Sequence, residues 1–243
     1  MKLGRKAVKT DSRTLRLARY LTASLPAPPV SCDWTRGQTA WQMYLNDSLG
    51  DCTIAGAMHQ IMGWSLNAGA EAAFTDQDAL SYYEKFDGYN PSDPSTDSGG
   101  VLLDVLNAWK KQGINGHKIT LYASVNPANQ TEVKQALAIF GPLYCGLSFP
   151  NSAMGAQTWE LTSDTSIDGG HCVVMIGYNA TGPVFISWGA LYQANWAFFD
   201  YYFSPAQYGE VYAAISLDWI ENSGVDPTGV NLAQLQADMA LIR

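Results

Sequence analysis

Apolar residues recur at helical spacing along the segment from Cys52 to about Ala68. Ile54, Met58 and Ile61 fall on one face, and small residues between them permit close packing. A polar loop interrupted by glycine, NDSLGD, precedes this segment, so the helix is expected to begin at the cysteine. The same spacing predicts three further helices, over residues 76–86, 101–113 and 131–141.

The pattern changes after residue 141. Short runs rich in β-forming residues, separated by Gly, Pro and Asn, predict strands at 142–149, 171–179, 183–189 and 211–220. Because helices come first and strands last, the order indicates an α+β protein. We expect four parts: a basic N-terminal arm (1–25), a mainly helical lobe (26–120), a mainly β lobe (121–220) and a C-terminal amphipathic helix (221–243).

Charge is distributed unevenly along the chain. Seven of the 14 Lys and Arg residues lie within residues 1–19, where Asp11 is the only acidic residue. The remainder has 7 basic and 21 acidic residues, a net charge of −14. Nucleic-acid binding by so acidic a body is not expected, and the arm is expected to lie on it as a strap.

No apolar run approaches the roughly 18 residues that a membrane helix needs. The basic start is not followed by the apolar core of a secretion signal. We therefore expect no membrane partner and a cytoplasmic location. The four cysteines show neither a CxxC pair nor the Cys/His spacing of zinc sites, so no metal and no other cofactor is expected.

Two polar positions carry the chemistry. Cys52 stands where a loop becomes a helix, and the unpaired N–H groups and positive dipole end there favour a thiolate. His171 follows two glycines at the entrance to a predicted buried strand, at a sheet rim beside the lobe boundary. A thiol and an imidazole that meet across a cleft form a nucleophile–base pair that attacks a carbonyl carbon. The backbone N–H of Cys52 and the side-chain amide of Asn46 are candidate donors to the resulting oxyanion.

Six short motifs, in order between about residues 28 and 220, resemble those of papain-like cysteine peptidases. They are CDWTRG, NDSLGDC, DSGGVLLDVLNAWKKQGI, GPLYCGL, HCVVMIGY and ISWG. The resemblance implies a two-lobed fold: a helical lobe, a β-barrel-like lobe and an active-site cleft between them. It also implies hydrolysis of a peptide or protein substrate through Cys52, His171 and an acyl-enzyme, with Asn46 in the position of the family's oxyanion glutamine. The NDSLGDCT loop is similar to that of a group of bacterial and phage proteins whose function is not firmly established.

The sequence departs from the family at the residue that orients the histidine. Ile186 stands where the family has an asparagine, and an isoleucine cannot accept a hydrogen bond. Ser187 is adjacent, but on a regular strand it would point to the opposite face. A catalytic role for Ser187 therefore requires a bulge or a one-residue slip. We expect no counterpart of the family's long inhibitory prodomain, because the arm of residues 1–25 is too short to replace it fully, although the arm is able to occlude the cleft.

The resemblance also implies substrate-binding positions. Gly99 and Gly100 lack Cβ atoms, so their backbone can pair with an extended peptide. Gly146 and Cys172 fall near the pocket for the residue preceding the cleaved one, and their small side chains indicate a roomy, apolar pocket. Trp188 is expected to pack beside the histidine and shield it from water.

Two alternative functions remain open. Ile186 is compatible with a catalytically impaired module of papain-like fold that binds a partner or serves as a structural component, for example in a phage particle. A thiol hydrolase that cleaves amides in cell-wall peptides would use the same residues. The acidic body makes this second alternative less favourable, because it would not be attracted to polyanionic walls.

Overall fold

The computed structural model describes residues 1–21, 25–69 and 71–216, together with positions 233 and 237. Its helices are α1 (Cys52–Ala68), α2 (Asp76–Asp87), α3 (Leu102–Gln112), α4 (Gln130–Phe140) and α5 (Trp196–Tyr202). Its strands are β1 (Cys32–Asp33), β2 (Leu121–Val125), β3 (Leu143–Pro150), β4 (Thr158–Trp159), β5 (Ile167–Tyr178), β6 (Pro183–Ser187), β7 (Ala190–Ala194) and β8 (Glu210–Ile215). Short 3-10 turns are η1 (Leu17–Arg19), η2 (Pro94–Thr96), η3 (Asn151–Ala153) and η4 (Pro205–Gln207). The α+β prediction is confirmed.

Helix α1 is the central element of the helical part. It begins at Cys52, as the sequence predicts, and ends where Gly69 adopts the left-handed conformation with φ of 82°. Fourteen of its 17 residues are buried, so the helix is enclosed on all sides and not only on one face. Cys52, the first residue of this enclosed helix, therefore lies in the core.

The strands form one sheet in the order β2-β8-β3-β5-β6-β7-β4, with β1 paired to β5. Along the described chain the outer strands, β2 and β4, do not pair with each other, so the sheet is open and not the closed barrel that the resemblance suggests. Strand β5 carries His171 and pairs on its two sides with β3 and β6. The histidine lies opposite Leu147 of β3, just before the stretch 174–178 of β5 that also pairs with β6.

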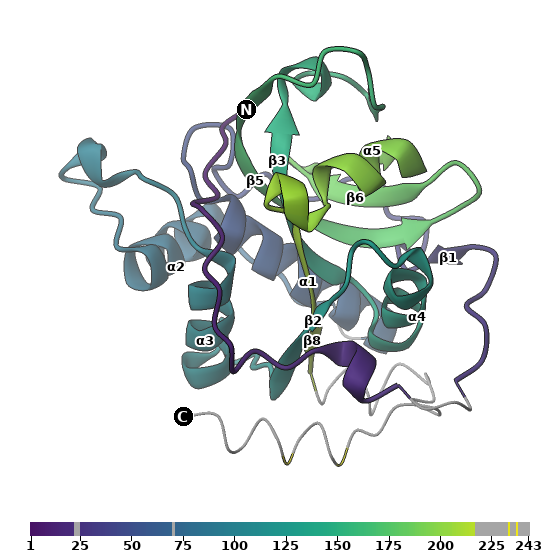
Figure 1. Cartoon of the computed structure of the whole chain (residues 1–243). Helices are drawn as coiled ribbons and strands as arrows, with labels where there is room; N and C mark the ends of the chain where they lie inside the picture. Colours follow the sequence, from purple (N-terminus) through teal and green to yellow (C-terminus); the bar gives the residue numbers. More distant parts are fainter. Residues whose placement is uncertain (22–24, 70, 217–232, 234–236, 238–243) are drawn as a thin grey trace.

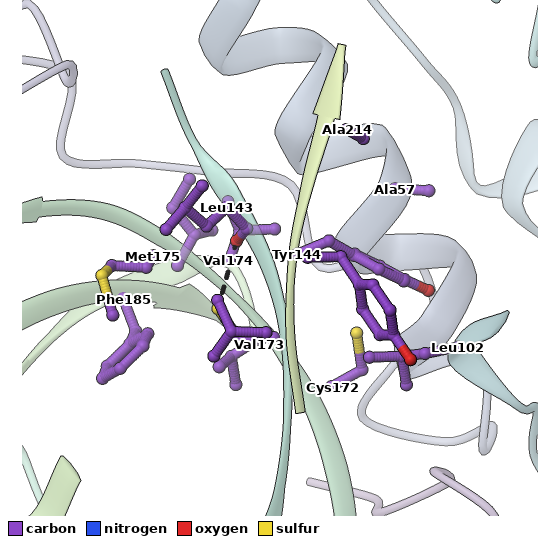
Figure 2. Packing of buried hydrophobic residues seen from close by; sticks show 14 of the residues in the cluster. Ala57, Leu102, Leu143, Tyr144, Cys172, Val173, Val174, Met175, Phe185 and Ala214 are labelled. Atoms are coloured by element: carbon purple, nitrogen blue, oxygen red, sulfur yellow. Dashed lines mark hydrogen bonds between the residues drawn. The ribbon is translucent and has the colours of Figure 1, made fainter. Parts of the chain in front are cut away.

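Helices cover the sheet from two directions. In Figure 1, α2 and α3 lie beside α1 on one side of the molecule, and α4 and α5 lie on the other side. Figure 2 shows that Tyr144 and Cys172 point from the strands toward α1, while Met175 and Phe185 lie on the opposite side. The first turn of α1 is tied to the sheet, because the Tyr144 hydroxyl donates to the Thr53 carbonyl at 2.7 Å.

The N-terminal arm runs as an extended chain along the body before the turn η1 (Figure 1). Its basic side chains form ion pairs with acidic residues of the body: Lys2 with Asp97, Arg5 with Glu210, and Lys9 with Asp104. Further along, the Ser124 N–H of β2 donates to the Leu15 carbonyl at 2.8 Å. The expected strap on an acidic surface is therefore what the structure shows.

Some elements were not expected from the sequence. The aromatic run over 196–202 forms helix α5, and β2, β4 and β7 are additional short strands. The predicted C-terminal helix at 221–243 lies outside the described residues apart from positions 233 and 237.

Candidate active site

Cys52 lies at the junction of the preceding loop and α1. Its side chain is only 1% exposed. The backbone N–H groups of Cys172, on β5, and of Gly4, in the arm, point at its sulfur. Because Cys172 directly follows His171, this contact places the thiol against the part of β5 that carries the histidine.

Burial determines whether the Cys52 thiol is protonated while the arm lies in the groove. It raises the pKa of Cys52 to about 12, more than the two N–H groups and the charge of Arg5 lower it. The expected thiolate is therefore not the form favoured here, since the sulfur is buried between β5 and the arm, with Cys172 and Gly4 against it. The helix terminus stabilises an anion only once the sulfur regains solvent or an ionic partner.

His171 is held by its Nε2 atom. This nitrogen lies 2.7 Å from the Ser187 hydroxyl, and the ring stacks on Trp188 with centroids 4.2 Å apart. The Nδ1 atom is buried and has no hydrogen-bond partner within the described part of the chain. Burial and then the charge of Arg5 lower the pKa of His171 to about 3, so the imidazole is neutral.

Ser187 reaches the histidine through the register of two strands. The register between β5 and β6 shifts between Met175 and Gly177, and the pairing continues with Met175 opposite Phe185 and Val174 opposite Ile186. Ile186 then points into the core at 0% exposed, and Ser187 shares the face of His171. A register shift of the kind on which a role for Ser187 depends is therefore present between β5 and β6.

A tight hairpin fixes this arrangement. Ser187 pairs with Ala190 across a two-residue turn, and both turn residues, Trp188 and Gly189, have positive φ values of 43° and 73°. Such a turn matches the twist of the strands that it joins. It positions Trp188 over the imidazole, where its indole N–H also donates to the Lys2 carbonyl of the arm at 3.2 Å.

Asn46 is buried close to the start of α1, at 2% exposed. Its side-chain amide donates to the Leu49 carbonyl at 3.3 Å and to Asp51 Oδ1 at 3.2 Å. Both amide hydrogens are thus used within the loop, and an oxyanion role would require one of them to be released. Asp51, which sequence reasoning missed, is itself buried, and burial raises its pKa to about 8.

Gly100 pairs with the arm as a neighbouring strand would. Its N–H donates to the Gly4 carbonyl at 2.8 Å, and its carbonyl accepts from the Lys6 N–H at 2.8 Å. Gly99, with φ of 80°, leaves room for the same arm residue, since a Cβ there would lie 1.8 Å from the Gly4 oxygen. The two glycines thus bind an extended chain, which is here a segment of the protein itself.

Gly146 and Cys172 are opposite each other on β3 and β5. The space beside Gly146 is filled by Arg5 and Glu210, because a Cβ at Gly146 would lie 2.8 Å from Arg5 Cδ and 2.9 Å from Glu210 Cγ. The pocket is therefore not apolar as expected, since it contains a carboxylate. Glu210 was missed; the available signal was a single acid at the start of an otherwise apolar strand, EVYAAI.

No cluster of three or more His, Cys, Asp and Glu side chains suited to a metal ion occurs among the described residues. None of the described helices combines the length and the apolar character that crossing a membrane requires. The four cysteines are all free, and Cys32 alone among them is only partly buried.

Solved structures of similar fold are cysteine proteases. Xylellain, a cysteine protease from Xylella fastidiosa, superposes with a TM-score of 0.68 at 15% identity, covering 88% of this chain and 96% of its own. A procathepsin B from Trypanosoma congolense gives 0.62 at 11% identity, covering 88% and 86%. The Carica candamarcensis protease CMS1MS2, in complex with E-64, gives 0.55 at 16% identity, covering 77% and 98%. No protein-family model and no curated protein matches the sequence.

The chain therefore has the fold of the papain-like cysteine peptidases. Identities of 11–16% establish the fold alone, so the roles of individual residues rest on the geometry described above.

Proposed function

We propose that this chain is a papain-like cysteine peptidase that hydrolyses peptide bonds. One observation carries the proposal: arm residues 2–6 lie as an extended peptide directly over the thiol. The arm is paired to Gly100 on one wall, and its Arg5 N–H donates to the Gly170 carbonyl on the other wall at 2.9 Å. A groove that binds an extended backbone next to a cysteine and a histidine supports peptide hydrolysis.

The chemistry follows from the atoms present. Cys52 Sγ attacks the carbonyl carbon of the peptide while its proton passes to Nδ1 of His171. The backbone N–H of Cys52 has no acceptor within α1, because it is the first residue of the helix, and it is available to the oxyanion. The imidazolium then gives its proton to the leaving amine, and the acyl group remains on sulfur. Water, activated by the neutral imidazole, hydrolyses that thioester.

Ser187 takes the orienting role in this scheme. When Nδ1 receives the proton of the thiol, Nε2 must already carry its own proton and donate it. The Ser187 hydroxyl at 2.7 Å is an acceptor for that N–H, so it holds the ring in the required tautomer.

The seated arm keeps this peptidase latent. It buries both groups, and the charge of Arg5 further opposes protonation of His171. Departure of the arm returns water to the groove, so the pKa of the thiol falls and that of the imidazole rises. Both changes favour the thiolate–imidazolium pair.

The test compares full-length chains that carry Arg5→Ala, which weakens the arm, with and without Cys52→Ala. Each is incubated with a library of peptides, and new termini are read by mass spectrometry. Cleavage that disappears with Cys52→Ala and persists with Cys145→Ala, another buried cysteine, supports the proposal. An identical background in all three chains would show that the fold serves binding and not hydrolysis.

A further inference from the structure

A second buried cysteine lies against Cys52 at the start of α1. The N–H of Cys172 points at the sulfur of Cys52, and the Cys172 side chain extends from β5 toward α1 (Figure 2). The two residues are only 1% and 3% exposed. Burial and then the charge of Cys52 raise the pKa of the Cys172 thiol well above its ordinary range. The second thiol is therefore within electrostatic reach of the proposed nucleophile.

Gly56 leaves room for the sulfur of Cys172 on the face of α1 that carries Cys52. Residues four apart lie one above the other on a helix, so Cys52 and Gly56 share this face. A Cβ at Gly56 would lie 3.0 Å from Cys172 Sγ and 3.1 Å from Tyr144 Cε2. The Cys172 sulfur thus packs against the bare backbone of α1, one turn after Cys52.

The Tyr144 hydroxyl fixes the second thiol from another direction. It donates to the Thr53 carbonyl at 2.7 Å and is in hydrogen-bond contact with the Cys172 thiol. Because Thr53 directly follows Cys52, this contact also places the Cys172 sulfur beside the first turn of α1. Three independent contacts, from a backbone N–H, a helical glycine and a tyrosine hydroxyl, therefore bring the two cysteines together.

The other two cysteines are placed differently. Cys145 of β3 lies opposite Val173, whereas Gly146 is the residue opposite Cys172. Successive side chains of a strand point to opposite faces, so the Cys145 side chain is on the other face of the sheet from that of Cys172. Cys32 lies on β1, which pairs with the far end of β5. Cys172 is thus the cysteine placed to react with Cys52, and Cys145 is a matched control.

We propose that Cys52 and Cys172 are a redox pair: when a peroxide oxidises Cys52 in the groove that the arm has left, Cys172 closes a reversible disulfide. The disulfide stops hydrolysis and protects the nucleophile from further oxidation. The inference rests on the proposed peptidase function for the role of Cys52 in hydrolysis, whereas the disulfide itself requires the two thiols alone. Its formation requires the side chains to turn until their Cβ atoms are about 3.5–4.5 Å apart.

The oxidation proceeds in two balanced steps. The Cys52 thiolate attacks one oxygen of hydrogen peroxide, the O–O bond breaks and hydroxide leaves, so the sulfur is oxidised to a sulfenic acid and the peroxide is reduced. The Cys172 sulfur then attacks the Cys52 sulfur, and the S–O bond breaks. The departing hydroxide takes the proton of the Cys172 thiol and leaves as water. A dithiol reductant restores both thiols by exchange and is itself oxidised to a disulfide.

The experiment treats the full-length Arg5→Ala protein, in which the arm is weakened, with hydrogen peroxide. Remaining thiols are blocked, the chain is digested with pepsin at acid pH to suppress thiol exchange, and mass spectrometry identifies joined peptides. We expect Cys52 joined to Cys172 as the main product, and the same product when Cys145→Ser is added. When Cys172→Ser is added instead, Cys52 should advance to the sulfinic acid.

Recovery of activity is measured separately. Each oxidised chain is treated with dithiothreitol, and its peptide hydrolysis is expressed relative to the same chain before oxidation. The chain that retains Cys172 should recover about tenfold or more of the relative activity that the Cys172→Ser chain recovers, because a thiol does not reduce a sulfinic acid. A joined Cys52–Cys172 product in a chain that cleaves no peptide supports the redox pair and overturns the peptidase alone.

Sulfinic acid at Cys52 beside an unmodified Cys172 thiol in the Arg5→Ala chain contradicts the redox pair, and a disulfide from Cys52 to Cys32 or Cys145 does so as well. Peptide cleavage by that chain before oxidation leaves the peptidase intact in both cases. A loss of folding by Cys172→Ser is checked by the melting temperature. Cys172→Ala removes the sulfur without adding a hydroxyl to the core, and it should give the same sulfinic acid at Cys52.

Discussion

His171 depends on a single neighbour for its orientation. Ser187 is the one hydrogen-bond partner found for Nε2 in the described chain, and the residue that replaces the family's asparagine, Ile186, is fully buried in the core. A serine is shorter than an asparagine, so the strand that carries it must approach the imidazole more closely. The hairpin turn at Trp188 and Gly189 provides that approach.

Replacing Ser187 with alanine tests this dependence. The buried Nε2–H would lose its acceptor, a cost of about 1–3 kcal/mol, so kcat/KM should fall about tenfold to a hundredfold in the Arg5→Ala background. NMR of the nitrogen-labelled imidazole ring of His171 should show that the population of the Nε2–H tautomer decreases.

The matched control is Ile186→Val, which removes one methylene from the neighbouring position. It should cost about 0.5–1.5 kcal/mol of stability and leave the tautomer unchanged. If Ser187→Ala also leaves the tautomer unchanged, Ser187 does not orient the histidine.

At the scale of elements, the arm and the groove meet backbone to backbone. A Cβ on Gly4 would lie 1.9 Å from the Gly50 carbonyl oxygen, which belongs to the loop that leads into α1. No rotation of a side chain relieves such an overlap, because both partners are main-chain atoms. The seating of the arm therefore requires a residue without a side chain at position 4.

Gly4→Val should displace the arm. We expect iodoacetamide to modify Cys52 about tenfold or more faster than in the unmodified chain, since a clash of this size costs more than about 1–3 kcal/mol. Peptide mass spectrometry measures the rate, with the partly buried Cys32 as an internal reference. Ala7→Val, at an exposed position of the same arm, is the control. Equal labelling of Cys52 in all three chains would mean that the arm does not limit access to the thiol.

Elements whose signals are local were predictable from the sequence. The start of α1 at Cys52 was found because a polar loop gives way to helical spacing there, and α2, α3 and α4 lie within about two residues of their predicted bounds. Helix α5 was missed, since its aromatic residues carry no clear helical period.

Contacts that depend on the register between strands could not be predicted from the sequence. The contact between Ser187 and His171 depends on a register shift between β5 and β6, which hydrophobic alternation alone does not fix. Glu210 meets Gly146 only because β8 pairs with β3, across more than 60 residues of chain. The position of the arm, similarly, results from hydrogen bonds to partners distant in the sequence, such as Gly100, Ser124 and Gly170.

For the whole molecule, buried titratable groups determine how stability depends on pH. The pKa of Asp51 is raised to about 8, and those of His59 and His171 are lowered to about 4 and about 3, in each case first by burial. Below pH 6.5 the unfolded histidines take up protons that the folded ones do not, so they reduce stability as the pH falls. Asp51 acts in the opposite sense: the folded state keeps a proton that the unfolded state has lost, and its contribution to stability declines from about pH 4 up to about pH 8.

Between pH 6.5 and 8, Asp51 is therefore the group among these three that changes stability. The free energy of unfolding should fall by about 1 kcal/mol per pH unit over this window, measured by urea denaturation. Asp51→Asn should abolish most of that slope, and Asp47→Asn, at an exposed neighbouring position, should retain it. The same slope with and without Asp51 would show that its carboxyl is already ionised in the folded protein.

Three glycines, at positions 4, 50 and 99, lie together where the arm crosses the thiol. Substitutions at these three positions should have different consequences in a genetic screen. A side chain at Gly50 would press on Asp97 of the body at 2.9 Å, and one at Gly99 would be strained by its φ of 80°. Position 4 alone contributes to the seated arm without being part of the scaffold beneath it. In a scan of all single substitutions that is selected for peptidase activity without any other release of the arm, substitutions at codon 4 should therefore be enriched above those at codons 50 and 99. Nearly every amino acid except glycine should be represented at codon 4.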